Sequence, residues 1–202
     1  MTKVEKEALE YYHRMNREID YLCIRLRNEL GHPPCPADCY SCCLNTSTLL
    51  ISKIEGLDIK EGLRQLPRPI QEDIYEKALK TIIKIDSLGF TEDQIVDGES
   101  LSVADTMIGM PESKCMMLVG GACAIYDHRP LICRVWGYPI KNGDKLSCCH
   151  KTFLEKRYSV KPLNFSLYWK ICQDLSARIG AKKKTPFCYM TKRILDELMH
   201  ES

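Results

Sequence analysis

Cysteine is the residue type in this chain that is best suited to bind a metal, and 12 of the 202 residues are cysteines. Four of them lie within nine residues, in the run Cys35-Pro-Ala-Asp-Cys39-Tyr-Ser-Cys42-Cys43. Prolines in and just before this run oppose a helix, so we predict a loop that curls around a bound group. A loop with four thiols indicates a metal site.

A second run of thiols contains a pair of glycines that is typical of a tight turn. Gly120-Gly121 lies between Cys115 and Cys123 and predicts a hairpin, with residues 118–119 and 124–125 as its two short strands. This hairpin would bring Cys115 back toward Cys123. Both runs therefore present their thiols from tight turns.

Thiolates suit zinc, copper(I) and iron–sulfur clusters, whereas magnesium and calcium would need carboxylates that these loops lack. A tetrahedral zinc ion and a cubane cluster each take four protein ligands. The candidate ligands are Cys35, Cys39, Cys42, Cys43, Cys115, Cys123, Cys133, Cys148 and Cys149, which are enough for two sites. Neighbouring side chains point in different directions, so Cys42 and Cys43 are expected to share one ion only if the loop is strongly bent.

Two arginines, Arg129 and Arg134, flank Cys133. A site of four thiolates carries a net charge of about −2 with either zinc or an oxidised cubane. A guanidinium beside it would offset that charge and donate hydrogen bonds to sulfur. The alternative is that these arginines pair with Asp127 or Asp144 at the surface.

The aromatic residues near Cys133 and the histidines have predicted roles of their own. Tyr126 and Trp136 are expected to pack in the core beside the site and to exclude water. A nucleophilic cysteine, the less favoured alternative to a ligand, would need a base such as His128 or His150.

The elements that must position these residues are mainly helical. Apolar residues three or four apart predict helices over residues 3–30, from Pro69 to about Gly89, over 163–179 and from Pro186 onward. We therefore predict a mainly α protein, a single helical domain over 1–202 with an irregular, cysteine-rich metal-binding centre and a small β-hairpin. Its parts would be an N-terminal helix (1–31), a cysteine-cluster core (32–150) and C-terminal helices (151–202). On these helices Cys23, Cys172 and Cys188 are expected to pack in the core.

Composition excludes several function classes. The chain has 29 Lys+Arg against 27 Asp+Glu, and a net charge of +2 predicts no nucleic-acid partner. No apolar run approaches the roughly 20 residues that span a bilayer, so no membrane partner is expected. The N-terminus does not resemble a signal peptide, which predicts a cytoplasmic, reducing location in which clustered cysteines bind metals.

The two cysteine runs together resemble the YkgJ-type cysteine-cluster family, the CxxCxxCC zinc- or iron-chelating domain family. The residues that carry the resemblance are Cys35, Cys39, Cys42 and Cys43, then Cys115, Leu118, Gly121, Cys123, Ile125-Tyr126, Arg129-Pro130, Cys133-Arg134 and Gly137-Tyr138-Pro139. The resemblance covers residues 35 to 150. The first loop departs from the family motif, with three residues between Cys35 and Cys39 where the motif has two.

The resemblance implies metal chelation, by an iron–sulfur cluster or zinc, with no general reaction assigned. A later family cysteine corresponds to Cys148 or Cys149. Flagellin lysine methylases share a similar cysteine module. From the residues and the resemblance together we expect a four-iron cluster, with zinc as the alternative. Two alternative functions stay open, a structural zinc module that docks a partner and a cluster-dependent enzyme with a protein or small-molecule partner.

Overall fold

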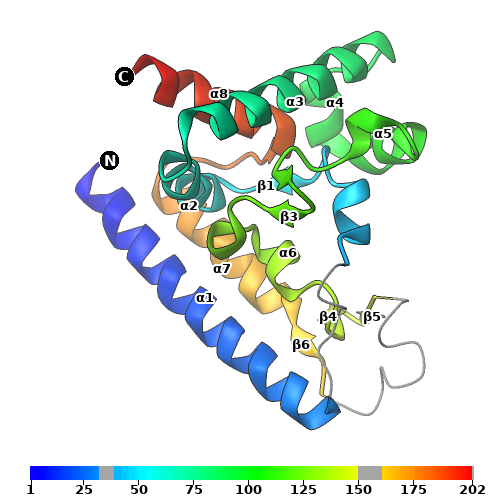
Figure 1. Cartoon of the computed structure of the whole chain (residues 1–202). Coiled ribbons are helices and arrows are strands. Elements are labelled where there is room, and N and C mark those ends of the chain that lie inside the picture. The colour runs from blue at the N-terminus through cyan, green and yellow to red at the C-terminus, as the bar shows by residue number, and fades with distance from the viewer. Residues whose placement is uncertain (32–38, 150–160, 202) are drawn as a thin grey trace. The chain divides into compact units, whose positions relative to one another are not determined.

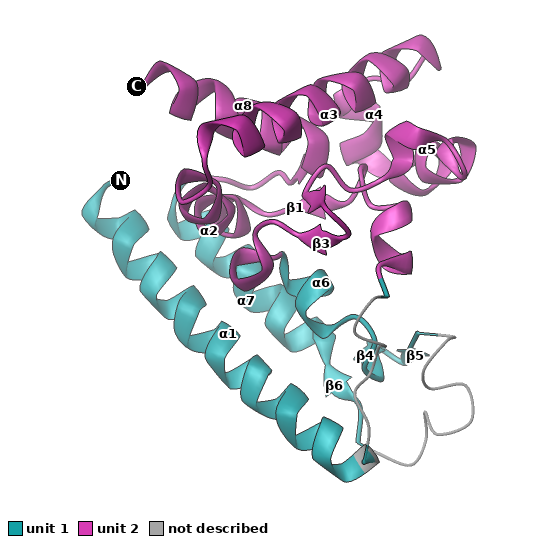
Figure 2. Ribbon diagram, in the orientation of Figure 1, with its two compact units in different colours: residues 1–39, 130–180 teal, residues 40–129, 181–202 magenta. Residues whose placement is uncertain are grey.

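The computed structural model describes residues 1–31, 39–149 and 161–201, and it is mainly helical (Figure 1), which confirms the predicted fold class. The chain divides into two compact units, each assembled from two segments (Figure 2). Unit 1 contains residues 1–39 and 130–180, and unit 2 contains residues 40–129 and 181–202. The predicted core of residues 32–150 is therefore divided between them, and the single domain stays a prediction. No helix in the described residues is both long and apolar enough to cross a membrane.

Unit 1 is built on the long helix α1 (Lys3–Leu30), which has the bounds that the sequence predicted. A capping box between Thr2 and Glu5 begins the helix, and Gly31 ends it with a φ of 74°, a left-handed conformation that suits glycine. Helix α1 packs against α6 (Leu131–Val135) and α7 (Phe165–Arg178).

A small sheet completes unit 1. Strands β4 (Ile140–Asn142) and β5 (Lys145–Ser147) form an antiparallel hairpin, and β6 (Leu163–Asn164) pairs with β4 in parallel. The strand order is β5-β4-β6. The β4–β5 hairpin of this sheet lies in the chain between α6, which carries Cys133, and the pair Cys148-Cys149.

Unit 2 is a second helical body. Its elements are β1 (Leu50–Ile51), α2 (Lys53–Arg64), α3 (Arg68–Ser87), α4 (Glu92–Gln94), a π-helical turn (Ile95–Glu99), α5 (Ser100–Met107), β2 (Leu118–Val119), β3 (Ala122–Cys123), β7 (Thr185–Pro186) and α8 (Phe187–His200). Helix α8 packs against α2 and α3, and β7 pairs with β1. Ile74, Ile85 and Leu195 are fully buried where these helices meet.

The hairpin of unit 2 differs from the prediction in its second strand. The turn holds only Gly120 and Gly121, both with positive φ of 58° and 82°, so Val119 pairs with Ala122 and Leu118 pairs with Cys123. The second strand is therefore Ala122–Cys123, and the predicted strand at residues 124–125 is wrong. Because of this register, Cys123 lies within the hairpin's own ladder.

Candidate metal centre

The two units separate the predicted ligands into two sets. Unit 2 holds Cys42, Cys43, Cys115 and Cys123, which we call the unit 2 thiol group. Unit 1 holds Cys39, Cys133, Cys148 and Cys149. Cys35 and His150 lie outside the described residues. All the described cysteines are free thiols.

Backbone hydrogen bonds join the two thiol runs within unit 2. A 3₁₀ turn (Ser41–Leu44) carries Cys42 and Cys43, and the backbone N–H of Cys115 donates to the carbonyl oxygen of Cys43 at 2.7 Å. The buried Ser113 hydroxyl donates to the Leu44 carbonyl, also at 2.7 Å. Residues about 70 positions apart in the chain are thus held side by side at the thiols themselves.

The hairpin β2–β3 adds the fourth thiol. The N–H of Leu118 donates to the Cys115 carbonyl at 3.1 Å, and Leu118 in turn pairs with Cys123 across the ladder. Beyond β3, the N–H of Ala124 donates to the Met117 carbonyl at 2.8 Å and extends the pairing. The two-residue turn therefore returns Cys123 to the side of the hairpin from which Cys115 enters.

The thiols of Cys42 and Cys43 lie close together. Their Sγ atoms are 4.0 Å apart in the 3₁₀ turn. The hydrogen bond between the two thiols lowers the pKa of Cys42 from its ordinary value of 9.0 to about 6. At its exposed position Cys42 therefore ionises more readily than an ordinary cysteine.

The other two thiols of the group are shielded from water. The pKa of the Cys115 thiol is raised to about 11, chiefly by burial and to a smaller extent by the neighbouring thiols Cys123 and Cys42. Burial also raises the pKa of Cys123. Burial and the repulsion between neighbouring thiolates both disfavour the ionised form of these thiols. A cation bound among the sulfurs would offset both effects.

The separations between the thiols bear on the kind of metal group that they suit. The ligands of one tetrahedral zinc ion lie about 3.8 Å apart, which follows from a zinc–sulfur bond of about 2.3 Å. The Cys42–Cys43 pair, at 4.0 Å, is close to this spacing. Among the described residues, however, no three thiol sulfurs lie within 4.8 Å of one another. The thiol donors are of the type that soft metals prefer.

The two predicted arginines lie in different units. Arg129, in unit 2, donates from Nη1 to the Tyr126 carbonyl at 2.8 Å, and its Cζ lies 3.8 Å from the centre of the Tyr126 ring. Its positive charge offsets part of the burial effect that raises the pKa of Cys123. Arg129 is therefore an arginine that acts electrostatically on a predicted ligand.

Arg134, in unit 1, is buried in an ion pair. Its Nη1 donates to Asp20 Oδ2 on α1 at 2.6 Å, and only 5% of the Arg134 side chain is exposed against 43% of the Asp20 side chain. The carboxylate is not one of the two that the sequence suggested. The role predicted for Arg134 at a metal site stays a prediction.

Two aromatic residues differ from the prediction. Tyr126 and Trp136 are exposed, not packed in the core. Tyr126 lies in the 3₁₀ turn η4 (Tyr126–His128), where the Arg129 guanidinium lies over its ring. By contrast Cys23, Cys172 and Cys188 are buried on their helices, as the sequence predicted.

The sequence did not reveal a buried Asp–His contact in unit 2. Asp58 on α2 lies 2.7 Å through Oδ1 from Nδ1 of His128. A signal was present, because Ile54, Asp58 and Gly62 follow one another at a spacing of four and so place a carboxylate on the buried face of α2.

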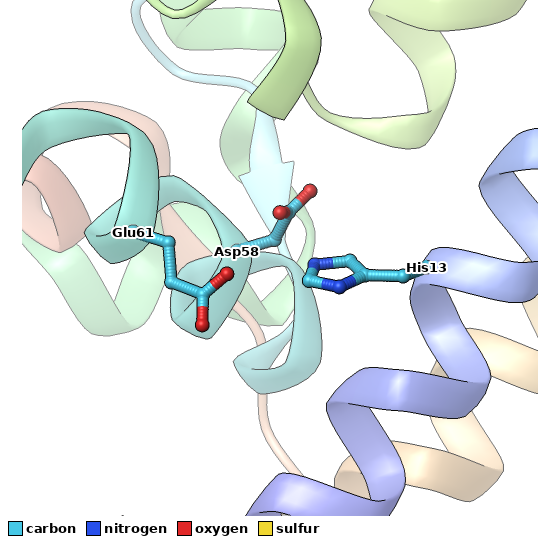
Figure 3. A group of neighbouring side chains, drawn as sticks. All are labelled: His13, Asp58 and Glu61. Carbon is cyan, nitrogen blue, oxygen red and sulfur yellow. The ribbon is translucent and has the colours of Figure 1, made fainter. Parts of the chain in front are cut away.

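One further group of possible ligands spans both units. Figure 3 labels Asp58 and Glu61 on α2 together with His13 on α1. His13 belongs to unit 1, whose position relative to unit 2 is not determined, so these three side chains define no site.

Comparisons with known proteins found no relative of this chain. No family model matches this sequence, and no curated protein and no solved structure was found to be similar to it.

Proposed function

We propose that the protein holds a metal centre through the cysteines of its two thiol runs, and that this centre is an iron–sulfur cluster of the four-iron type or, failing that, zinc. The observation that carries the proposal is the 2.7 Å hydrogen bond from the Cys115 N–H to the Cys43 carbonyl, which joins the two runs at their thiols.

The chemistry of the unit 2 thiol group supports this proposal. It offers one exposed thiol with a lowered pKa, Cys42, and two shielded thiols, Cys115 and Cys123, that a cation would stabilise as thiolates. Arg129 supplies one positive charge toward a site that would carry about two negative ones. A bound cluster would supply electron transfer, and the arginine would tune its potential.

The resemblance to the YkgJ-type family supports the same proposal, since the unit 2 thiol group contains the last two cysteines of the first motif and the first two of the second. A cytoplasmic location also agrees with the free thiols of the described residues. A cluster-dependent enzyme related to flagellin lysine methylases would need a substrate pocket beside these thiols. A structural zinc module is favoured instead by the zinc-like spacing of Cys42 and Cys43.

The test is metal and sulfide analysis of anaerobically purified protein, together with its absorbance spectrum. We expect iron and acid-labile sulfide, and we expect Cys42→Ser and Cys123→Ser to lose most of both. Cys188→Ser is the matched control, because Cys188 is fully buried on α8 and should keep the metal. Stoichiometric zinc without iron, from cells given both metals, would favour the structural module, and protein without either metal would refute the proposal.

A further inference from the structure

The buried contact between Asp58 and His128 fastens the chain between Cys123 and Arg129 to helix α2. Only 2% of the Asp58 side chain and 20% of the His128 side chain are exposed, and 2.7 Å separates Oδ1 from Nδ1. His128 ends the turn η4 and immediately precedes Arg129. A carboxylate that accepts from Nδ1 also fixes the orientation of the imidazole ring.

Helix α2 carries a glycine, Gly62, where this histidine packs against it. A Cβ atom at Gly62 would lie 2.8 Å from the Cβ of His128, which is closer than real Cβ atoms approach. Glycine at position 62 therefore permits the close approach of η4 to the helix. The far side of the ring, Nε2, faces the amide of Gln65 at 3.4 Å.

The segment from Cys123 to Arg129 is thus held at both ends. The Ala124 N–H holds its start to the hairpin at 2.8 Å, and the contact with Asp58 holds its end. The Arg129 side chain contacts Tyr126, an exposed residue of the same turn. The place of the Arg129 guanidinium is consequently set by how firmly η4 is fastened.

We propose that Asp58 and His128 are positioning residues for the unit 2 thiol group, which hold the Arg129 guanidinium beside Cys123. This inference rests on the proposed metal function. It assigns to the Asp–His pair a role outside the ligand set, comparable to the carboxylates and histidines that orient ligands from behind a metal site. Neither residue is expected to touch the metal.

The experiment measures how fast the protein, loaded with metal as purified, releases that metal to excess chelator under anaerobic conditions. His128→Leu removes the donor, and we expect release about tenfold faster, the size of effect typical for residues behind a metal site. His128→Asn keeps an N–H near the position of Nδ1 and should restore most of the wild-type rate. Arg193→Gln is the control, because it breaks the exposed ion pair with Glu92 elsewhere in unit 2.

A double-variant cycle tests whether the pair acts through the arginine. Arg129→Gln alone should also speed release, and adding His128→Leu to it should change the rate less than twofold, because both changes remove one interaction. The absorbance spectrum of the bound metal and the urea midpoint are recorded for each variant. If His128→Leu does not fold, Asp58→Asn takes its place in the cycle.

The outcomes separate this inference from the proposed function. Wild-type protein without metal refutes the proposed function and the inference with it. Wild-type protein that holds metal, with a folded His128→Leu variant that releases it at the wild-type rate, overturns only the positioning role. Effects of the two single variants that multiply in the double variant overturn the route through Arg129.

Discussion

The low pKa of Cys42 leads to a pH profile that can be measured without any metal. The hydrogen bond between the Cys42 and Cys43 thiols, across 4.0 Å, is the largest cause of the low pKa. Replacing Cys43 by alanine removes this hydrogen bond. We expect the pKa of Cys42 to move from about 6 back toward 9.0 in the Cys43→Ala variant.

The size of the effect depends on pH because two factors compete. At about pH 5.5, roughly a quarter of Cys42 is thiolate against about 3 in 10,000 for an ordinary cysteine, a ratio of several hundred. A thiolate with a lower pKa is also a weaker nucleophile, by roughly 20-fold over three pKa units. Cys42 should therefore be alkylated about 30-fold faster than an ordinary cysteine at about pH 5.5. At about pH 9 the order reverses, and Cys42 should react roughly tenfold more slowly.

The assay is the initial rate of iodoacetamide alkylation of metal-free protein, with the modified cysteine assigned by tandem mass spectrometry. The same chain in urea supplies the ordinary cysteines for reference. We expect the wild-type rate at Cys42 to level off above about pH 7 and the Cys43→Ala rate to rise through about pH 9. A wild-type rate that climbs tenfold per pH unit up to about pH 9, or a profile that Cys43→Ala leaves unchanged, would refute the reasoning.

Two further predictions concern stability, measured by urea unfolding. Gly62→Ala should cost about 1–2 kcal/mol, because crowding of His128 by about 1–3 kcal/mol exceeds the helix propensity gained from alanine. Gly56→Ala, whose Cβ would meet the flexible end of a methionine side chain, should be nearly neutral. Asp20→Asn should cost about 1–2 kcal/mol, because it replaces the carboxylate that pairs with the buried Arg134 guanidinium by a neutral amide. An unchanged urea midpoint for Gly62→Ala or for Asp20→Asn would contradict the corresponding packing or ion-pair argument.

Sequence reasoning succeeded where structure depends on neighbouring residues. Helix α1 runs from Lys3 to Leu30 because the apolar spacing and the glycine stop are both local. The prediction that a helix begins at Pro69 is confirmed likewise, because this proline stands in the first turn of α3. These signals act over three or four residues, so they can be read without knowing the rest of the fold.

Sequence reasoning failed where the outcome depends on which segments meet. Tyr126 was expected in the core because aromatic residues near cysteines usually pack there, yet its ring is exposed beneath Arg129. The Asp58–His128 contact joins residues 70 positions apart. Local spacing carries little information about such a contact.

The burial of the unit 2 thiols also implies that metal affinity depends on pH. Cys42 is exposed and its pKa is lowered, so it loses its proton more readily than an ordinary cysteine. Cys115 is buried with its pKa raised to about 11, so it gives up its proton only when a cation is close enough to offset the cost of a buried thiolate. Under the proposed function, metal binding would therefore release a proton from Cys115, and metal affinity would fall as the pH is lowered.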